Sequence, residues 1–169
     1  MPTQATGDAA VLIVGASGGI GRALVQHYLN AEDATVVIAV SRGHRPLCFE
    51  TAGKRLLWRS CDYTETSITA EADWIRTLGL RINRVVICNG ILHNESIAPE
   101  KTIASLNGSV MHEVFQANVV VPSLWIGALP RLLPKGADCV VAVLSARVGS
   151  ISDNRLGGWH SYRASKAAL

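Results

Sequence analysis

Features that would mark a metalloprotein, a redox protein or a membrane protein are missing from this sequence of 169 residues. Its four cysteines lie far apart without a C-x-x-C pair, which gives no zinc or redox motif, so we expect reduced thiols and no metal. Lys and Arg are scattered under a net charge of +3, which gives no case for a nucleic-acid partner. The start MPTQATGDAA lacks a leader pattern, and no apolar run reaches the roughly 18 residues of a membrane span. We therefore expect a cytoplasmic protein with no membrane partner.

Apolar runs of strand length alternate with segments of helical spacing along the chain. We expect strands at 11–14, 35–40, 54–60, 85–88 and 139–144, and helices at 21–30, 68–78 and 109–133, the last broken or ended near Pro130 and Pro134. Continuous apolar strands are typical of a parallel sheet that is covered on both faces. The pattern predicts an α/β fold, a doubly wound parallel sheet of Rossmann type, in a single domain over residues 1–169.

A glycine-rich turn follows the first strand, in the segment VLIVGASGGIG. Gly15 permits the tight turn, while Gly19 and Gly21 let the backbone approach a pyrophosphate and pack helix against strand. The helix N-terminus then offers N–H groups and a partial positive charge to phosphate. An ordinary connection made of small residues would look similar, but the strand–turn–helix context favours dinucleotide binding.

The end of the second strand, AVSRGHRP, indicates which cofactor is bound. An NAD-binding domain usually has an acidic residue there, whereas this chain has Ser41 and Arg42. Arg42 could bind a 2′-phosphate, with His44 and Arg45 adding to the field. A solvated basic loop is the alternative, so we predict NADP(H) and keep NAD(H) possible.

Two polar residues allow two interpretations each. Asp62, in SCDYT, could accept a hydrogen bond from the adenine amino group, or could cap or turn the chain before the next helix. Asn118 lies in the apolar segment FQANVVVPSL, where an amide needs a partner. It could hold a backbone carbonyl or a water near Lys166, or could be a buried and satisfied asparagine.

Tyr162 and Lys166 are four residues apart in YRASK, so on a helix they share one face. A cation beside the phenol would lower the tyrosine pKa and make Tyr162 a proton donor or acceptor near neutrality. Ser145 ends the apolar strand before it, at the sheet edge where such folds bind ligands, and could stabilise an oxyanion. Considered separately, Tyr162 and Lys166 would be a pair on the protein surface without a function, and Ser145 would be a turn or cap residue.

The glycine-rich turn, Asn118, Ser145 and the Tyr162–Lys166 pair, in this order on a βαβ frame, resemble the short-chain dehydrogenase/reductase superfamily. The stretch LSARVGSISDNRLGGWHSYRASKAAL is similar to its C-factor-like branch of carbonyl reductases. The resemblance implies an oxidoreductase that transfers hydride between NADP(H) and a small-molecule carbonyl or alcohol. It implies that Tyr162 exchanges the proton and Ser145 orients the carbonyl. Lys166 would hold the ribose and tune Tyr162, and Asn118 would support a proton relay.

The resemblance also implies a set of cofactor contacts. These are Gly15, Ser17, Gly18, Gly19, Ile20, Gly21, Ser41, Arg42, Asp62, Tyr63, Asn89, Gly90, Tyr162 and Lys166. Two of the segments depart from the family pattern. Val14 replaces the usual threonine before the first glycine, and ICNG, with Cys88, replaces N-N-A-G. We expect the backbone contacts there to persist.

The catalytic serine also departs from the family pattern. Many relatives carry the hydroxyl three residues before the loop glycine, which here gives Ala146, counting from Gly149. Ser145 lies one position earlier and 17 residues before Tyr162, a longer interval than usual. We nevertheless predict Ser145, with Ser150 as the substitute.

The chain stops at Leu169 inside the helix of Tyr162, without a capping residue. Relatives continue through two more strands, so we expect a domain that is incomplete at its C-terminus, with those strands missing. The same helix commonly forms the family's subunit interface, which predicts a homodimer or homotetramer when complete. The alternative function is a catalytically silent, nucleotide-bound signalling or regulatory protein of the same fold.

Overall fold

The computed structural model describes residues 8–31 and 35–169. They form two compact units that interleave along the sequence. One unit extends through Cys88 and includes Leu124–Val143, and the other comprises Asn89–Ser123 and Leu144–Leu169. The first unit contains the sheet, and the second contains the residues predicted to be catalytic. That the whole chain forms a single domain stays a prediction.

The first unit is built on a five-stranded sheet in the order β3-β2-β1-β4-β5. All neighbouring strands run parallel. The strands are β1 (Ala9–Val14), β2 (Val36–Ser41), β3 (Leu56–Ser60), β4 (Arg81–Ile87) and β5 (Val140–Val143). This order, with helical crossovers, confirms the predicted Rossmann-type α/β fold.

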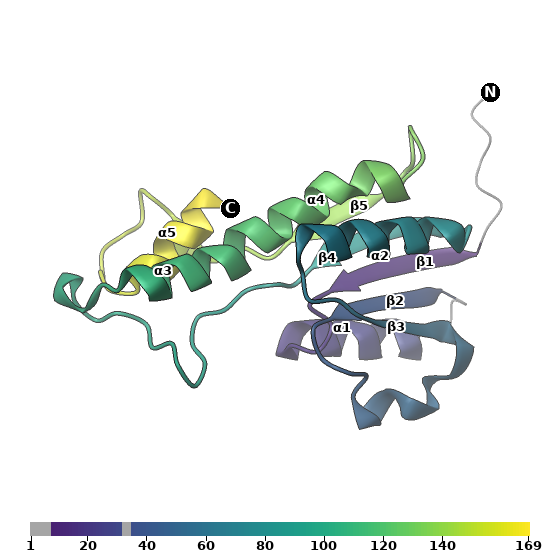
Figure 1. The fold of residues 1–169 in the computed structure, drawn as a ribbon, viewed down its shortest axis with the longest axis horizontal. Helices are drawn as coiled ribbons and strands as arrows, with labels where there is room; N and C mark the ends of the chain where they lie inside the picture. The colour runs from purple at the N-terminus through teal and green to yellow at the C-terminus, as the bar shows by residue number, and fades with distance from the viewer. Residues whose placement is uncertain (1–7, 32–34) are drawn as a thin grey trace. The chain divides into compact units, whose positions relative to one another are not determined.

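Helices cover both faces of this sheet (Figure 1). The chain forms α1 (Gly19–Asn30), a 3₁₀ helix (Leu47–Arg55), α2 (Glu65–Thr77), α3 (Gly108–Phe115), α4 (Val121–Leu132) and α5 (His160–Ala168). Two of these helices, α2 and α4, lie side by side, and Arg131 of α4 approaches Asp73 of α2 to 3.6 Å. Within the described ranges, no helix is both long and apolar enough to cross a bilayer.

The central strands explain why the sheet is stable. Val11 and Ile13 of β1 and Val37 and Ala39 of β2 are fully buried and pack in one cluster with Val25 of α1. Alternate residues on both strands point to opposite faces, and both sets are buried, as a doubly covered parallel sheet requires.

The expectation of coverage on both faces is wrong for β5. Val140 and Val141 are 64% and 40% exposed. Among the described strands β5 is an edge that pairs only with β4, so the apolar residues of this run lack neighbours on one side. A run of valines therefore predicted the strand correctly but not its burial.

The predicted long helix at 109–133 ends near Pro134 as expected, but it is also interrupted earlier in the chain. Between α3 and α4, Gln116–Val120 forms a π-helical turn that contains Asn118. Pro130 lies inside α4, which ends at Leu132, before Pro134. Single π-helical turns occur often at functional sites because they redirect side chains within a helix.

Candidate active site

The glycine-rich turn of the first unit depends on close backbone approach. Gly15 has a φ of 80° and donates from its N–H to the carbonyl of Val40 at 2.9 Å. A Cβ on Gly21 would lie 2.2 Å from the Gly15 carbonyl oxygen, which no side chain can tolerate. A Cβ on Gly19 would meet nothing within 4 Å. Gly21 is therefore fixed by the turn itself, whereas Gly19 borders open space.

The N-terminus of α1 is free to bind an anion. Its N-cap, Gly18, makes no side-chain hydrogen bond, and the first turn carries no acidic residue. Ser17 and Ile20 beside it are exposed. Uncapped N–H groups with the positive end of the helix dipole suit a phosphate group. The residues present fit the pyrophosphate of a dinucleotide.

At the end of β2, the side chain of Arg42 is available to bind a ligand. Ser41 Oγ donates to Ser17 Oγ at 2.6 Å, which ties the strand end to the glycine-rich turn. Arg42 is exposed and makes no hydrogen bond or ion pair within the described part of the chain. Arg45, by contrast, donates to the carbonyl of Phe49. His44 lines a separate cavity of about 500 Å³ along β3.

The carboxylate of Asp62 serves the start of α2. Its Oδ1 accepts from the N–H and the hydroxyl of Thr64, at 2.9 and 2.8 Å, and from the hydroxyl of Ser67. Hydrogen bonds from Ser67 and Thr64 lower the Asp62 pKa. The structure thus favours the capping interpretation for Oδ1. Tyr63 is buried at a φ of 66°, and its hydroxyl donates to the carbonyl of Val40, so its side chain is part of the packing below β2.

In the second unit, Gly90 lies against two predicted catalytic side chains. A Cβ on Gly90 would lie 3.1 Å from Lys166 Nζ and 3.3 Å from Asn118 Oδ1. Asn89 beside it has a buried Oδ1 without a hydrogen-bond partner in the described residues. An unpaired buried acceptor at a predicted cofactor contact is consistent with a ligand that supplies the donor.

Asn118 is fully buried and satisfied. Its Nδ2 donates to the carbonyl of Ile91 at 3.0 Å and to Ser165 Oγ at 2.9 Å, and its Oδ1 accepts from the Ile91 N–H at 2.6 Å. The side chain thus clamps the backbone after β4 to α5. The sequence allowed a backbone partner for this amide, and the structure identifies it as Ile91.

Tyr162 and Lys166 share one face of α5, as predicted. Lys166 Nζ donates to the carbonyl of Leu144 at 2.8 Å and lies 5.8 Å from the centre of the Tyr162 ring. Burial raises the pKa of the Tyr162 phenol and lowers the pKa of the Lys166 ammonium. The shift of the tyrosine pKa is thus opposite to the expected lowering, and its cause is the desolvation of the phenol by burial.

Ser145 follows β5 and lies against the same helix. Its side chain is exposed, and Oγ donates to the Lys166 carbonyl at 3.4 Å. A Cβ on Gly149 would lie 2.8 Å from the backbone of Lys166, so this loop packs tightly on α5. Ser145 and Asn118 are thus both hydrogen-bonded to α5, the helix that carries Tyr162 and Lys166.

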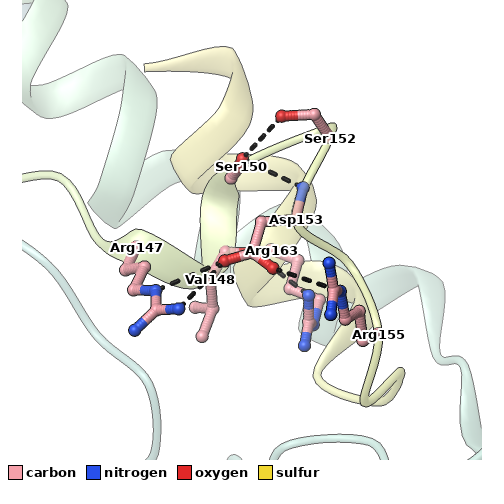
Figure 2. Close-up of polar contacts among 7 residues, drawn as sticks. All are labelled: Arg147, Val148, Ser150, Ser152, Asp153, Arg155 and Arg163. Carbon is pink, nitrogen blue, oxygen red and sulfur yellow. Dashed lines mark hydrogen bonds and ion pairs between the residues drawn. The ribbon is translucent and has the colours of Figure 1, made fainter.

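The loop between Ser145 and Tyr162 is held by charged side chains (Figure 2). The carboxylate of Asp153 accepts from Arg147 at 3.1 Å and pairs with Arg155 at 3.9 Å. Ser150 Oγ accepts from the N–H of Asp153 at 3.2 Å, so it forms part of the loop's own turn. Both candidate serines therefore have hydrogen-bond partners of their own, and the choice of Ser145 over Ser150 stays a prediction.

Sequence reasoning missed a buried carboxylate in this unit. Glu100 accepts from both the N–H and the hydroxyl of Ser161, at the start of α5. The two residues are 61 positions apart, so no local pattern could reveal the pair. Trp159, which precedes the helix in a left-handed conformation, was also missed, although two glycines before it indicated a turn.

Comparison with known proteins shows the family. Residues 9–169 match the short chain dehydrogenase family, and the chain belongs to it. It is 27% identical, over 94% of its length, to 1-hydroxy-2-glutathionyl-2-methyl-3-butene dehydrogenase of Rhodococcus sp.. It is 30% identical, again over 94%, to benzil reductase ((S)-benzoin forming) of Saccharomyces cerevisiae. The chain spans 65% and 61% of the length of these two relatives.

Solved structures agree with this assignment. A carbonyl reductase from Pseudomonas aeruginosa has a TM-score of 0.74 at 29% identity, with 95% of this chain and 72% of that chain covered. A Burkholderia multivorans protein assigned to the short-chain dehydrogenases/reductases, with bound NADP, has a TM-score of 0.81 at 28% identity, with 96% and 69% covered. The predicted membership of the superfamily is confirmed, and the carbonyl reductase match fits the predicted branch.

Gly21→Ala should lower the free energy of unfolding by about 1–3 kcal/mol, because the new Cβ forces the Gly15 carbonyl to move. Urea denaturation of the native full-length protein measures this change. Gly19→Ala is the matched control, since its Cβ would meet nothing within 4 Å, and it should be neutral or slightly stabilising. Equal losses in both variants would show that the close approach at Gly21 does not matter.

Asn118→Ala should be more destabilising than Ser165→Ala. The first variant leaves the Ile91 N–H and carbonyl without partners, at a cost of roughly 1–3 kcal/mol for each buried group. The second removes only the acceptor for Asn118 Nδ2 within this pair and should cost about 1 kcal/mol. Denaturation curves of the two variants give the comparison, and a reversed order would contradict the clamp.

Proposed function

We propose that the protein is an oxidoreductase that transfers hydride between NADP(H) and a carbonyl or alcohol substrate, with Tyr162 as the proton donor or acceptor. The observation that supports this most is the second unit's arrangement around α5. The loop of Ser145 and the clamp of Asn118 are both hydrogen-bonded to the helix that carries Tyr162 and Lys166. A protein that only bound nucleotide would need no such set of proton-transferring groups.

The choice of NADP(H) rests on two independent arguments. Arg42 is exposed and unpaired within the described residues, at the strand end where the 2′-phosphate of NADP would lie. A structural relative at 28% identity carries bound NADP. Dehydrogenase and reductase relatives support the reaction class, but their substrates differ from each other, so we assign only the carbonyl/alcohol pair.

The residues of the second unit suit the reductive direction. Bound nicotinamide would supply the hydride. Because burial raises the pKa of Tyr162, its phenol is protonated at neutral pH and can donate to the developing alkoxide. The hydroxyl of Ser145 is exposed and can donate to the same oxygen if it turns away from the Lys166 carbonyl, its partner at 3.4 Å. Lys166 uses one N–H on Leu144 and keeps others for a ribose hydroxyl.

Tyr162→Phe should lower the rate of carbonyl reduction by about 100- to 10,000-fold, the usual contribution of a general acid. Binding of NADPH, followed by fluorescence titration of the native full-length protein, should change little, because only the hydroxyl is removed. An unchanged rate would reject the proton-donor role. Binding without turnover in the parent protein, over a panel of aldehydes and ketones, would instead favour the silent regulatory function.

Arg42→Ala should raise the KM for NADPH about tenfold or more and leave the KM for NADH nearly unchanged, because a hydrogen bond to a charged group contributes roughly 1.5–3 kcal/mol. Steady-state kinetics with both cofactors measures the ratio. Lys54→Ala, which removes an exposed charge of the same sign, is the control. Equal effects on the two cofactors would reject Arg42 as a phosphate-binding residue.

A further inference from the structure

Trp159 has an unusual backbone conformation directly before α5. Its φ and ψ are 53° and 41°, and it follows Gly157 and Gly158, whose φ values are 65° and 67°. Glycine adopts this left-handed region readily, whereas a bulky residue rarely does and needs support from its surroundings. Trp159 thus has a conformation that the neighbouring structure must impose.

Glu100 supplies that support through its main-chain carbonyl and its carboxylate. Its main-chain carbonyl accepts from the Trp159 N–H at 2.6 Å. Its carboxylate, which belongs to a residue only 5% exposed, accepts from the Ser161 N–H at 3.3 Å and from the Ser161 hydroxyl. Gly158 passes so close that a Cβ there would lie 3.3 Å from the Glu100 carbonyl oxygen. We call these three hydrogen-bonded residues, Glu100, Trp159 and Ser161, the Glu100 anchor.

The Glu100 carboxylate also accepts hydrogen bonds at the start of α5, where the N-cap residue has no side-chain acceptor. Trp159 is the N-cap of α5 and has no side-chain acceptor for the free N–H groups of the first turn. The Glu100 carboxylate provides that acceptor from a distant loop and places negative charge at the positive end of the helix. The anchor therefore fixes both the start of α5 and the residue before it.

The result is an aromatic ring held beside the proposed proton donor. The rings of Trp159 and Tyr162 meet edge to face, with centroids 6.4 Å apart and planes at 80°. Trp159 nevertheless stays 40% exposed, so much of the indole is available to another molecule. A ring pinned in a strained conformation next to a reacting group is positioned to contact the substrate.

We propose that Trp159 is a specificity-determining residue that favours carbonyl substrates with an aryl group next to the carbonyl, and that Glu100 is its positioning residue. This inference rests on the proposed function, since it describes the same site. The flat aryl group would pack on the exposed part of the indole while the carbonyl oxygen meets Tyr162. A saturated ring of similar size lacks the aromatic contribution to this contact.

The test compares acetophenone with cyclohexyl methyl ketone as substrates of the native full-length protein with NADPH. Trp159→Leu, which keeps an apolar side chain with the same backbone demand, should lower the ratio of the two kcat/KM values about three- to tenfold, mainly through the KM for acetophenone. Trp159→Phe, which keeps an aromatic ring, should retain most of the ratio.

Glu100→Gln tests the positioning role. Glutamine has a similar size but only one acceptor oxygen in its side chain, so the start of α5 should loosen. The acetophenone preference should fall in the same direction as in Trp159→Leu, and Ser161→Ala should show the same trend. A merely structural role would lower stability and both rates together without changing their ratio, and that result would reject Glu100 as a positioning residue.

The outcomes separate the inference from the proposed function. If Trp159→Leu reduces both ketones with an unchanged ratio, the specificity role is rejected and the oxidoreductase function stands. If the parent protein reduces no carbonyl compound, and Tyr162→Phe behaves identically, both are rejected.

Discussion

Buried polar groups on α5 impose the main constraint on the second unit. Ser161, Ser165 and Lys166 are all buried, and each needs a hydrogen-bond partner because an unpaired buried group costs roughly 1–3 kcal/mol. Ser165 also donates to the carbonyl of Tyr162 within the helix, but each of the three has a partner that is distant in sequence. These distant partners are the carboxylate of Glu100, the amide of Asn118 and the carbonyl of Leu144. Hydrogen bonds therefore hold three segments that are far apart in sequence against one helix, and these contacts bring the residues of the candidate active site together.

The same burial sets the electrostatics of the site. Desolvation raises the pKa of Tyr162 and lowers the pKa of Lys166, so the enclosure that organises the residues also disfavours charge on both. A neutral phenol suits a group that gives a proton to a carbonyl under reduction. Lys166 donates one N–H to the carbonyl of Leu144, and the other N–H groups of its ammonium can bind a ligand.

The first unit builds a binding site by a different means. Instead of polar side chains, the glycine-rich turn offers backbone, and the N-terminus of α1 is left without a side-chain cap. Such an end is a cost in stability that a bound phosphate can offset. Close packing at Gly21 holds the turn in place, while the space beside Gly19 remains open. Gly21 thus contributes to the stability of the turn, and Gly19 leaves space for a ligand.

Much of the molecule followed from the sequence alone, because its determinants are local. Apolar runs and helical spacing predicted the strands and most of the helices within a few residues, but not the 3₁₀ helix Leu47–Arg55 or the π-helical turn. The glycine-rich turn and YRASK predicted a family that the comparisons confirm. Only the tertiary structure decided which partner satisfies each buried group. The Glu100–Ser161 pair, the Asn118–Ile91 clamp and the raised pKa of Tyr162 depend on segments tens of residues apart and on the water excluded between them. Hydrogen-bond partners and desolvation are properties of packed neighbours, and a linear pattern does not specify them.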